Sequence, residues 1–318
     1  MPVTNSLSKS TGVYKPFTYP HYVDAAAKHD IIFWHEKEVS LGDDVEQWNN
    51  GTISPEEKRR VTQILRVFTQ MDAEVASNYC DHWIPFFKNN EVRMALLSIA
   101  HREGVHMRAY SLLNDTLGLP EEDYAKFKEY TEMAEKIDFI GVDGIGSAED
   151  MAFSIHRTVF SEGVLLFAAF AMLLSPNRFG RLRGISTIAE WSLRDESQHV
   201  AIMSKLARDF REEQGIEGEY LEKGTYALAL DAVAAEDNFI DLVYSESEDP
   251  DLSREDLKQY IRYIADIRLE QLGYNKMFHA SNPLKWIDMQ LMEGLTNFFE
   301  GTTTEYQAGG GLVGEWEW

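Results

Sequence analysis

Residues 96–113, LLSIAHREGVHMRAYSLL, set apolar side chains at the spacing of one helix face and place three polar groups on that same face. The face consists of Leu96, Ile99, Glu103, His106, Tyr110 and Leu113. A charge on a buried face costs on the order of several kcal/mol unless it is protonated, ion-paired or bound to a metal. The stretch therefore predicts a core helix that points a carboxylate and an imidazole at a partner inside the protein.

Three other segments with helical periodicity also direct carboxylates inward. Asp72 lies on one of these apolar faces and Glu162 on the second, while Glu196 and His199 share the third. Glu74 is close to Asp72 in sequence, but its phase points further from the apolar face. Because no Lys or Arg shares these faces at comparable spacing, metal ions are the simplest source of neutralising charge.

The inward groups form a ligand set of two single carboxylates and two Glu-x-x-His pairs. Its members are Asp72, Glu162, Glu103 with His106, and Glu196 with His199. Ferritin-like di-iron and di-manganese bundles use this inventory, with Asp72 here replacing one Glu. We therefore expect two metal ions per chain. Iron is the first expectation, with manganese or a mixed pair as alternatives, because these metals accept the same ligands.

The alternative to a metal site is a chance pattern. The chain has nine histidines, so about one Glu-x-x-His is expected by chance. A lone inward histidine is also more often a hydrogen-bonded core residue than a ligand. Four inward carboxylates, two of them in phase with a histidine, favour metal binding over that explanation.

Helical periodicity continues through nearly the whole chain, without the sustained alternation that indicates a sheet. The predicted class is all-α, a ferritin-like helical bundle. One helix begins at Ser54-Pro55-Glu56-Glu57, a start with a cap, a first-turn proline and a capping box, and runs to about Cys80. Further helices are expected at about 20–38, 90–116, 120–137, 149–174, 179–213, 218–246, 253–275 and 284–298.

We divide the chain into an N-terminal arm at 1–19, a helical bundle domain at 20–300 and a C-terminal tail at 301–318. The tail, GTTTEYQAGGGLVGEWEW, has several glycines and no helical pattern. Such composition is typical of a mobile end. Its two terminal tryptophans are unusual for a soluble chain and are common anchors in binding.

Composition narrows the functional classes. The formal charge of -23 disfavours nucleic acids and anionic membrane surfaces as partners. We find no apolar run long enough to span a bilayer and no signal peptide at the polar N-terminus, so a cytoplasmic location is expected. Cys80 is the only cysteine, so dithiol chemistry would have to belong to a partner chain.

From about Ile31 to Tyr306 the sequence closely resembles the radical-generating small subunit of class I ribonucleotide reductase. Several motifs carry the resemblance. They are Phe33-Trp34 with Glu38-Val39, Asp72, EGVHMRAY at 103–110, Glu162, RDESQH at 194–199, NFFE at 297–300 and EYQ at 305–307.

The resemblance implies that the six ligands hold two metal ions that activate oxygen, and that Tyr110 carries a stable tyrosyl radical. Trp34, Asp195 and His106 would form the hydrogen-bonded chain that carries an electron between the metal site and the surface. Tyr306 would relay it to a large catalytic subunit, bound through the C-terminal tail, which reduces ribonucleoside diphosphates to deoxyribonucleotides. A homodimer is also implied by the resemblance.

Read without the resemblance, these redox residues have ordinary explanations. Tyr110 lies one turn beyond His106 on the ligand face, where a core tyrosine is the alternative to a radical site. Trp34 would be a core aromatic and Asp195 a helix-surface acid.

Two positions depart from the family pattern. Leu166 and Ser192 stand where an aromatic and an aliphatic residue often line the radical pocket. The pocket is therefore expected to be roomier or wetter than usual.

Two other functional classes use similar ligands. A ferritin-like ferroxidase would be far shorter and would not need Tyr306. A di-iron oxidase or hydroxylase would open a substrate channel to the metals and would not need Tyr110. A pure interaction protein gives no reason for inward carboxylates.

Overall fold

The computed structural model describes residues 6–10, 12–142 and 145–291, and all regular structure in these ranges is helical. The predicted all-α class is confirmed. The helices are α1 (Pro20–Ile31), η1 (Glu36–Glu38), α2 (Gly42–Asn49), α3 (Pro55–Asn78), η2 (Tyr79–Trp83), α4 (Ile84–Phe86), α5 (Asn90–Leu117), η3 (Glu121–Glu129), α6 (Thr131–Ile140), α7 (Ala148–Gly163), α8 (Phe167–Leu174), η4 (Ser175–Phe179), α9 (Arg183–Gln214), α10 (Glu219–Val243) and α11 (Arg254–Gln271).

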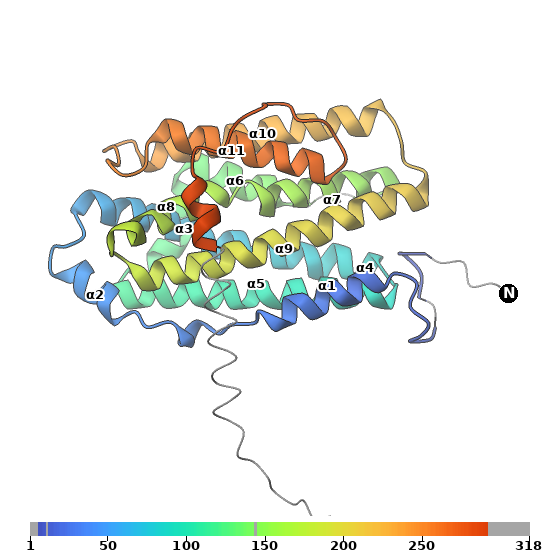
Figure 1. Cartoon of the computed structure of the whole chain (residues 1–318), viewed down its shortest axis with the longest axis horizontal. Helices are drawn as coiled ribbons and strands as arrows, with labels where there is room; N and C mark the ends of the chain where they lie inside the picture. Colours follow the sequence, from blue (N-terminus) through green and yellow to red (C-terminus); the bar gives the residue numbers. More distant parts are fainter. Residues whose placement is uncertain (1–5, 11, 143–144, 292–318) are drawn as a thin grey trace, which may run out of the picture. The chain divides into compact units, whose positions relative to one another are not determined.

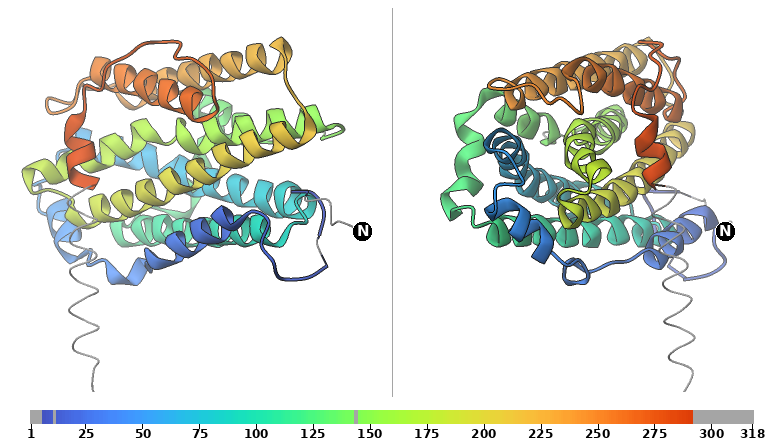
Figure 2. Two further views of the ribbon diagram at one scale, coloured as in Figure 1. Left: turned by 45° about the vertical axis from the view of Figure 1, so that its right-hand side comes forward. Right: turned by 60° about the vertical axis from the view of Figure 1, so that its left-hand side comes forward.

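The helices that carry the inward carboxylates pack against one another. Helix α3 lies along α5, α7 lies along α9, and α5 also contacts α9 (Figure 1). Helix α1 runs beside α5 on one side of this core, and α10 and α11 form a pair on the other, as both views in Figure 2 show. The ligand faces of α3, α5, α7 and α9 therefore meet in the interior.

Helix α3 begins as predicted. The Ser54 hydroxyl accepts a hydrogen bond from the Glu57 backbone N–H at 3.1 Å, and Pro55 occupies the first turn. The Glu57 carboxylate pairs with Arg181 at 3.4 Å. At the other end α3 stops at Asn78, and the chain continues as a π-helical turn, η2, in place of a plain helix to Cys80. Such turns are rare and often lie at functional sites.

The single helix predicted at 149–174 is wrong, because α7 and α8 are separated at Val164–Leu166. The Gly163 carbonyl accepts a hydrogen bond from the Arg268 guanidinium at 2.9 Å, and Phe167 N–H bonds to the Val164 carbonyl instead. A Cβ at Gly163 would lie 2.7 Å from Arg268 Nε. Glycine is thus required where Arg268 enters, and the helix breaks immediately after the Glu162 turn.

Two other predicted helices are divided in the structure, and one short helix was not predicted. The helix expected at 20–38 ends at Ile31, and residues 36–38 form the separate turn η1, capped by His35. The helix expected at 120–137 is a 3-10 helix followed by α6, with extended backbone at Tyr130 between them. The short helix α2 was not predicted. Residues 285–291 are helical, and the rest of the helix predicted at 284–298 lies outside the described residues.

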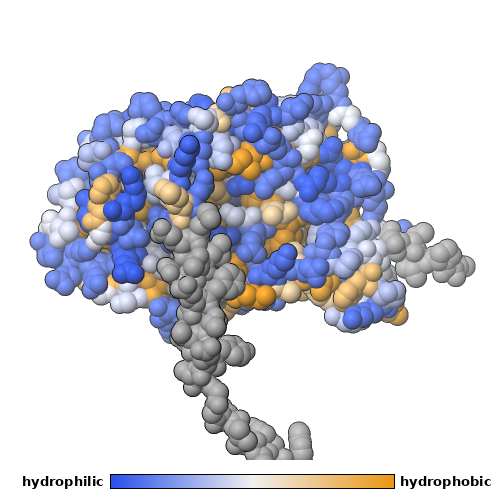
Figure 3. Space-filling model, in the orientation of Figure 1, coloured by the Kyte–Doolittle hydropathy of each residue, from blue (hydrophilic) through white to orange (hydrophobic). Residues whose placement is uncertain are grey.

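One stretch, Ala148–Phe179, is long and apolar enough to cross a membrane by length and composition, contrary to the sequence prediction. Its most apolar window is completely buried in the protein, as expected for core helices. Outside the grey atoms, the face in Figure 3 is mainly hydrophilic with smaller apolar patches.

The chain divides into two compact units, residues 1–283 and 284–318. The helices α1 to α11 and η1 to η4 belong to the first unit, and the helical residues 285–291 belong to the second. Within the first unit, the Leu7 backbone N–H donates to Glu213, and the Leu7 carbonyl accepts from Asn89 N–H. The predicted limits of the arm, bundle and tail stay predictions.

Candidate metal centre

Six acidic and histidine side chains meet between α3, α5, α7 and α9, and each is at most 2% exposed. They are Asp72 on α3, Glu103 and His106 on α5, Glu162 on α7, and Glu196 and His199 on α9. The structure thus brings together all six ligands that the sequence predicts. Glu74 is directed elsewhere, since its carboxylate accepts a hydrogen bond from Gln70.

The six residues form two overlapping groups. Ligand atoms of Asp72, Glu103, His106 and Glu196 lie within 4.8 Å of one another. Those of Glu103, Glu162, Glu196 and His199 do so as well. Because Glu103 and Glu196 belong to both, their carboxylates could bridge two ions while the other residues each serve one.

Both histidines turn the same nitrogen inward. His106 Nδ1 lies 3.2 Å from Glu196 Oε1 and 3.5 Å from Glu103 Oε2. His199 Nδ1 lies 2.9 Å from Glu103 Oε1 and 3.3 Å from Glu162 Oε2. The two Nε2 atoms point away from the four carboxylates of this group and contact residues outside it.

Several inward atoms of this group face only one another and make no well-aligned hydrogen bond within the described residues. They are Asp72 Oδ2, both oxygens of Glu103, His106 Nδ1, Glu162 Oε2, Glu196 Oε2 and His199 Nδ1. Buried polar atoms without partners are costly unless a bound group satisfies them. The donor set, carboxylate oxygens with two imidazole nitrogens, suits iron or manganese.

The pKa values of two of the carboxylates also favour a bound cation. Burial raises the pKa of Asp72 well above its usual value, and the charge of Glu103 adds to this effect. Burial likewise raises the pKa of Glu162 to about 8. Without a cation, the chain therefore holds these carboxylates poorly as anions, and a metal would have to displace protons to bind.

On its outer side, His106 is supported by a carboxylate. His106 Nε2 lies 3.2 Å from Asp195 Oδ2, and the Trp34 indole N–H donates to the same oxygen at 2.7 Å. Arg102 lies 3.3 Å from it as well. Although burial tends to raise the pKa of Asp195, the hydrogen bond from His106 and the charges around it hold that pKa below its usual value. The predicted chain of Trp34, Asp195 and His106 is thus connected by hydrogen bonds, and its redox role stays a prediction.

On its outer side, His199 is supported by a second imidazole. His199 Nε2 lies 3.3 Å from His29 Nε2, and His29 Nδ1 lies 2.8 Å from the Ser98 hydroxyl. Burial, together with the nearby His199, lowers the pKa of His29 to about 2. His29 is therefore neutral at physiological pH.

Tyr110 is 1% exposed and lies against Phe68, with ring centroids 4.8 Å apart. Its hydroxyl and that of Ser192 are both buried. Burial, and next the charge of Asp72, raise the pKa of Tyr110 well above its usual value, although the interaction with the Ser192 hydroxyl tends to lower it. The phenol is therefore neutral and sheltered beside the ligand group.

A second tyrosine touches the centre. Tyr79, the first residue of η2, is fully buried and donates a hydrogen bond to Glu162 Oε1 at 2.8 Å. The other Glu162 oxygen is left free to bind a metal. The sequence analysis did not identify Tyr79, His29 or Arg102. Of these three, only Arg102 could have been suspected from the sequence, because it directly precedes Glu103.

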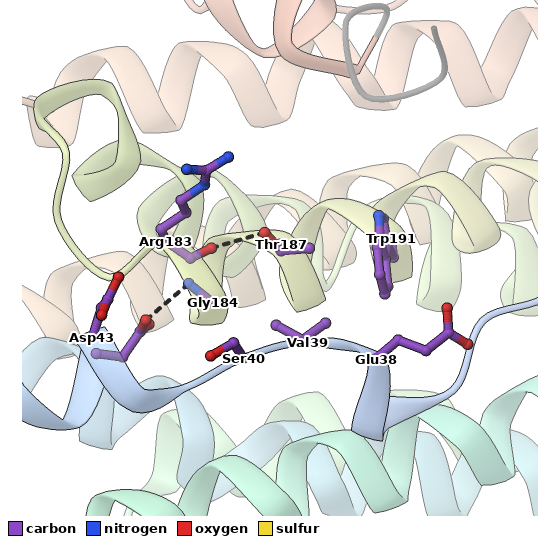
Figure 4. A pocket seen from close by; sticks show the side chains of 9 residues that line it. Glu38, Val39, Ser40, Asp43, Arg183, Gly184, Thr187 and Trp191 are labelled. Atoms are coloured by element: carbon purple, nitrogen blue, oxygen red, sulfur yellow. Dashed lines mark hydrogen bonds between the residues drawn. The ribbon is translucent and has the colours of Figure 1, made fainter. Parts of the chain in front are cut away.

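A surface cavity of about 320 Å³ lies near the Trp34 end of this arrangement (Figure 4). It is lined by residues of η1, α2 and α9 and the chain between them, including Glu38, Arg183 and Trp191. The Trp191 ring is 5.4 Å from that of Trp34. One indole ring thus separates Trp34 from this cavity. Tyr306 lies outside the described residues, so its place relative to this surface is not described.

Comparison with known proteins places these features in a family. A family model described as "Ribonucleotide reductase, small chain" matches residues 12–283. The probable ribonucleoside-diphosphate reductase small subunit 376L of Invertebrate iridescent virus 6 is 37% identical over 95% of each chain. The ribonucleoside-diphosphate reductase subunit beta of Chlamydia pneumoniae is 28% identical over 93% of this chain and 89% of the relative.

Solved structures agree on the fold. The ribonucleotide reductase R2 subunit from Clostridium botulinum superposes with a TM-score of 0.81 at 22% identity, covering 89% of this chain and 92% of the other. The Rnr4 homodimer from Saccharomyces cerevisiae gives a TM-score of 0.74 at 18% identity, covering 93% of this chain and 89% of the other. The predicted ferritin-like bundle is confirmed.

Proposed function

Since the chain belongs to the ribonucleotide reductase small-chain family, we propose that its six buried ligands hold two metal ions and that Tyr110 carries the radical generated there. The relatives are small subunits of ribonucleoside-diphosphate reductase, and the chain is accordingly assigned to this oxidoreductase. The radical would be passed to a large catalytic subunit for the reduction of ribonucleotides.

The donor set supports a pair of divalent ions. Four carboxylates bring up to four negative charges into the core, and two divalent cations balance them. When bound, a redox-active pair, iron first and manganese or a mixed pair as alternatives, would use oxygen to provide the oxidant that takes one electron and one proton from Tyr110. Glu103 and Glu196 belong to both groups of ligands and would help to hold either ion.

The surroundings of Tyr110 suit a long-lived radical. Its ring is buried against Phe68, and Phe68 in turn packs on Phe170 at 5.2 Å. These apolar neighbours keep water and thiols away from an oxidised phenol. Ser192 is the one hydroxyl beside Tyr110 that sequence analysis singled out, and its side chain is fully buried.

The route out of the centre would follow hydrogen bonds. Asp195 accepts from the Trp34 indole and contacts His106, so one carboxylate oxygen joins a metal ligand to an aromatic ring near the surface. From Trp34 the electron exchange would continue through Tyr306 to the large subunit.

A partner chain is required by the thiol inventory. Ribonucleotide reduction consumes two thiols, and Cys80, which is exposed, is the only cysteine. The nucleotide chemistry would therefore take place on the large subunit, to which the C-terminal tail would bind. Assembly as a homodimer belongs to the same proposal.

The observation that carries the proposal is the set of inward atoms without well-aligned hydrogen bonds beside the buried Tyr110. The test is to load the protein with Fe²⁺, add oxygen and record the visible and paramagnetic resonance spectra. A sharp tyrosyl signal is expected, and Tyr110→Phe should remove it while leaving the metal content unchanged. Tyr124→Phe is the matched control, since the Tyr124 hydroxyl bonds to Ser111 and not to the centre. A normal tyrosyl signal in Tyr110→Phe would place the radical elsewhere.

The tail separates a radical donor from an enzyme that acts alone. Tyr306→Phe should leave metal content, the Tyr110 radical and affinity for the large subunit intact but stop turnover. Deleting 312–318 should weaken binding to the large subunit while the isolated protein still forms its radical. Wild-type turnover from both variants, with the large subunit limiting, would refute the role of the tail and favour the oxidase alternative.

A further inference from the structure

Behind His199, away from the carboxylates, four side chains form a continuous line of contacts to the surface of the chain. His199 Nε2 lies 3.3 Å from His29 Nε2, and the two rings meet edge to face, with an interplanar angle of 88°. His29 Nδ1 lies 2.8 Å from Ser98 Oγ, and the Ser98 hydroxyl donates to Asp30 Oδ1 at 3.1 Å. His29 is fully buried, whereas Asp30 is exposed.

The direction of each hydrogen bond follows from the last one. A carboxylate only accepts, so the Ser98 hydroxyl spends its single hydrogen on Asp30. Ser98 Oγ must then accept from His29 Nδ1–H. A neutral His29 has one N–H, which leaves its Nε2 as an acceptor, and His199 Nε2–H is the group that donates to it.

The consequence falls on the metal ligand. With one hydrogen fixed on Nε2, a neutral His199 carries its lone pair on Nδ1, the atom that faces Glu103, Glu162 and Glu196. We propose that His29, Ser98 and Asp30 form a positioning arm that holds His199 in its metal-binding tautomer and ring orientation. This inference rests on the metal centre proposed above and assigns His29 as a positioning residue for it.

The arm differs in kind from the support of His106. Asp195 gives His106 an anionic partner, whereas His199 has only a neutral imidazole behind it. A neutral outer partner makes the ligand less basic than an anionic one does. The ion bound by His199 is therefore held less tightly than the ion bound by His106, and it depends more on the arm.

The experiment is a titration of the full chain with Mn²⁺, in which paramagnetic resonance counts the free ion. Wild type is expected to bind two ions per chain. His29→Leu should raise the Kd of the ion held by His199, called here the second ion, by roughly 10–100-fold. The Kd of the first ion, held by His106, should not change. His29→Gln should stay close to wild type, because the Gln carbonyl can accept from His199 while its amide donates to Ser98.

Further variants test how much each residue of the arm contributes to binding of the second ion. Ser98→Ala should weaken the second ion, and Asp30→Asn should do so less, because the Asn carbonyl still accepts from Ser98. Ser77→Ala is the matched control, since its hydroxyl bonds only to the Ala73 carbonyl on the exposed side of α3. Circular dichroism and thermal unfolding of the metal-free proteins check that each variant folds. If His29→Leu does not fold, Ser98→Ala and His29→Gln decide.

The outcomes separate two failures. Two ions bound by His29→Leu with wild-type affinity would overturn the arm and leave the centre standing. A loss in His29→Gln equal to that in His29→Leu would also overturn it, because ring shape and not hydrogen bonding would then matter. A wild type that binds no Mn²⁺ would refute the centre itself.

Discussion

The ligand group around Glu103 and Glu196 and the ion pair of Lys136 with Glu236 are equally buried, but only the pair is neutral by its own composition. Lys136 Nζ lies 2.5 Å from Glu236 Oε1, and both side chains are completely inaccessible. The ligand group has four carboxylates and two imidazoles, with inward atoms that lack well-aligned hydrogen bonds. Burial of charge alone therefore says little about function, whereas an unbalanced set of buried charges predicts a bound ion.

The Lys136–Glu236 pair shows how buried charges can be compensated within the chain. The Lys136 ammonium lies 3.9 Å from the centre of the Phe239 ring, and the Ala168 N–H bonds to Glu236. The pair thus links α6 to α10 and to the first turn of α8, just after the break that follows Glu162. Each of the two charges faces an opposite charge within the chain, so the pair needs no added cation, although Glu236 Oε2 has no hydrogen-bond partner among the described residues.

The largest effect on metal binding is expected when a carboxylate is removed from the ligand group. Glu196→Ala deletes a carboxylate shared by both ligand subsets, so at least one of the two ions should be lost and the radical should not form. Metal analysis per chain measures this directly. Two ions per chain in this variant would contradict the role of Glu196 as a metal ligand, and with it the contrast between the ligand group and the Lys136–Glu236 pair.

Breaking the ion pair should cost stability and spare metal binding. Lys136→Met leaves Glu236 buried without a cation, which lowers the free energy of unfolding by roughly 3–5 kcal/mol. The double variant Lys136→Met/Glu236→Gln should recover most of the loss, because Gln is neutral and still accepts from Ala168 N–H. Urea unfolding of the metal-free proteins tests both. A single variant as stable as wild type would mean that the pair is not held as the structure has it.

The same variant should be more sensitive to pH than the double variant. Burial raises the pKa of Glu236 to about 7, and Lys136 counteracts that rise, so the pKa in Lys136→Met is higher still. A carboxyl whose pKa is raised on folding favours the folded state below its unfolded pKa and loses that contribution as pH rises through the folded pKa. Lys136→Met should therefore lose stability by up to about 1.4 kcal/mol per pH unit between pH 5 and pH 7, relative to the double variant. Parallel pH profiles would speak against this account.

The smallest effect on stability is expected from Glu162→Gln. Gln keeps an oxygen for the Tyr79 hydroxyl and removes one carboxylate from a crowded acidic group. The metal-free variant should thus unfold within about 1 kcal/mol of wild type, although it is weakened as a metal ligand. Thermal unfolding after treatment with a chelator measures it. A loss of several kcal/mol would make Glu162 a structural residue and remove the contrast with Lys136.

The sequence predicted which of these side chains point inward, because that direction obeys a local rule. Glu103, His106 and Tyr110 repeat at helical spacing on one face, so their common direction is visible without the rest of the protein. The same holds for Asp72 and Glu162 on their own helices. Only the meeting of the four faces needed the structure.

The outer residues His29 and Tyr79 could not be predicted, because their partners are distant in sequence. His29 reaches His199 across 170 positions, and Tyr79 reaches Glu162 across 83. The break after α7 has the same origin, since Arg268 captures the Gly163 carbonyl from 105 positions away. Helical periodicity describes neighbours within a few turns, and it contains no information on such contacts.

The buried stretch Ala148–Phe179 has a consequence for how the chain is made. As it leaves the ribosome it has the length and apolarity of a membrane span, and its main cover, α9, is synthesised next. At roughly 5–20 residues per second, the 32 residues of α9 take about 2–6 seconds to appear. During that interval the nascent chain exposes a segment that targeting factors and chaperones bind by hydrophobicity alone. Translation that pauses before α9 would therefore lengthen the time for which this apolar segment is uncovered.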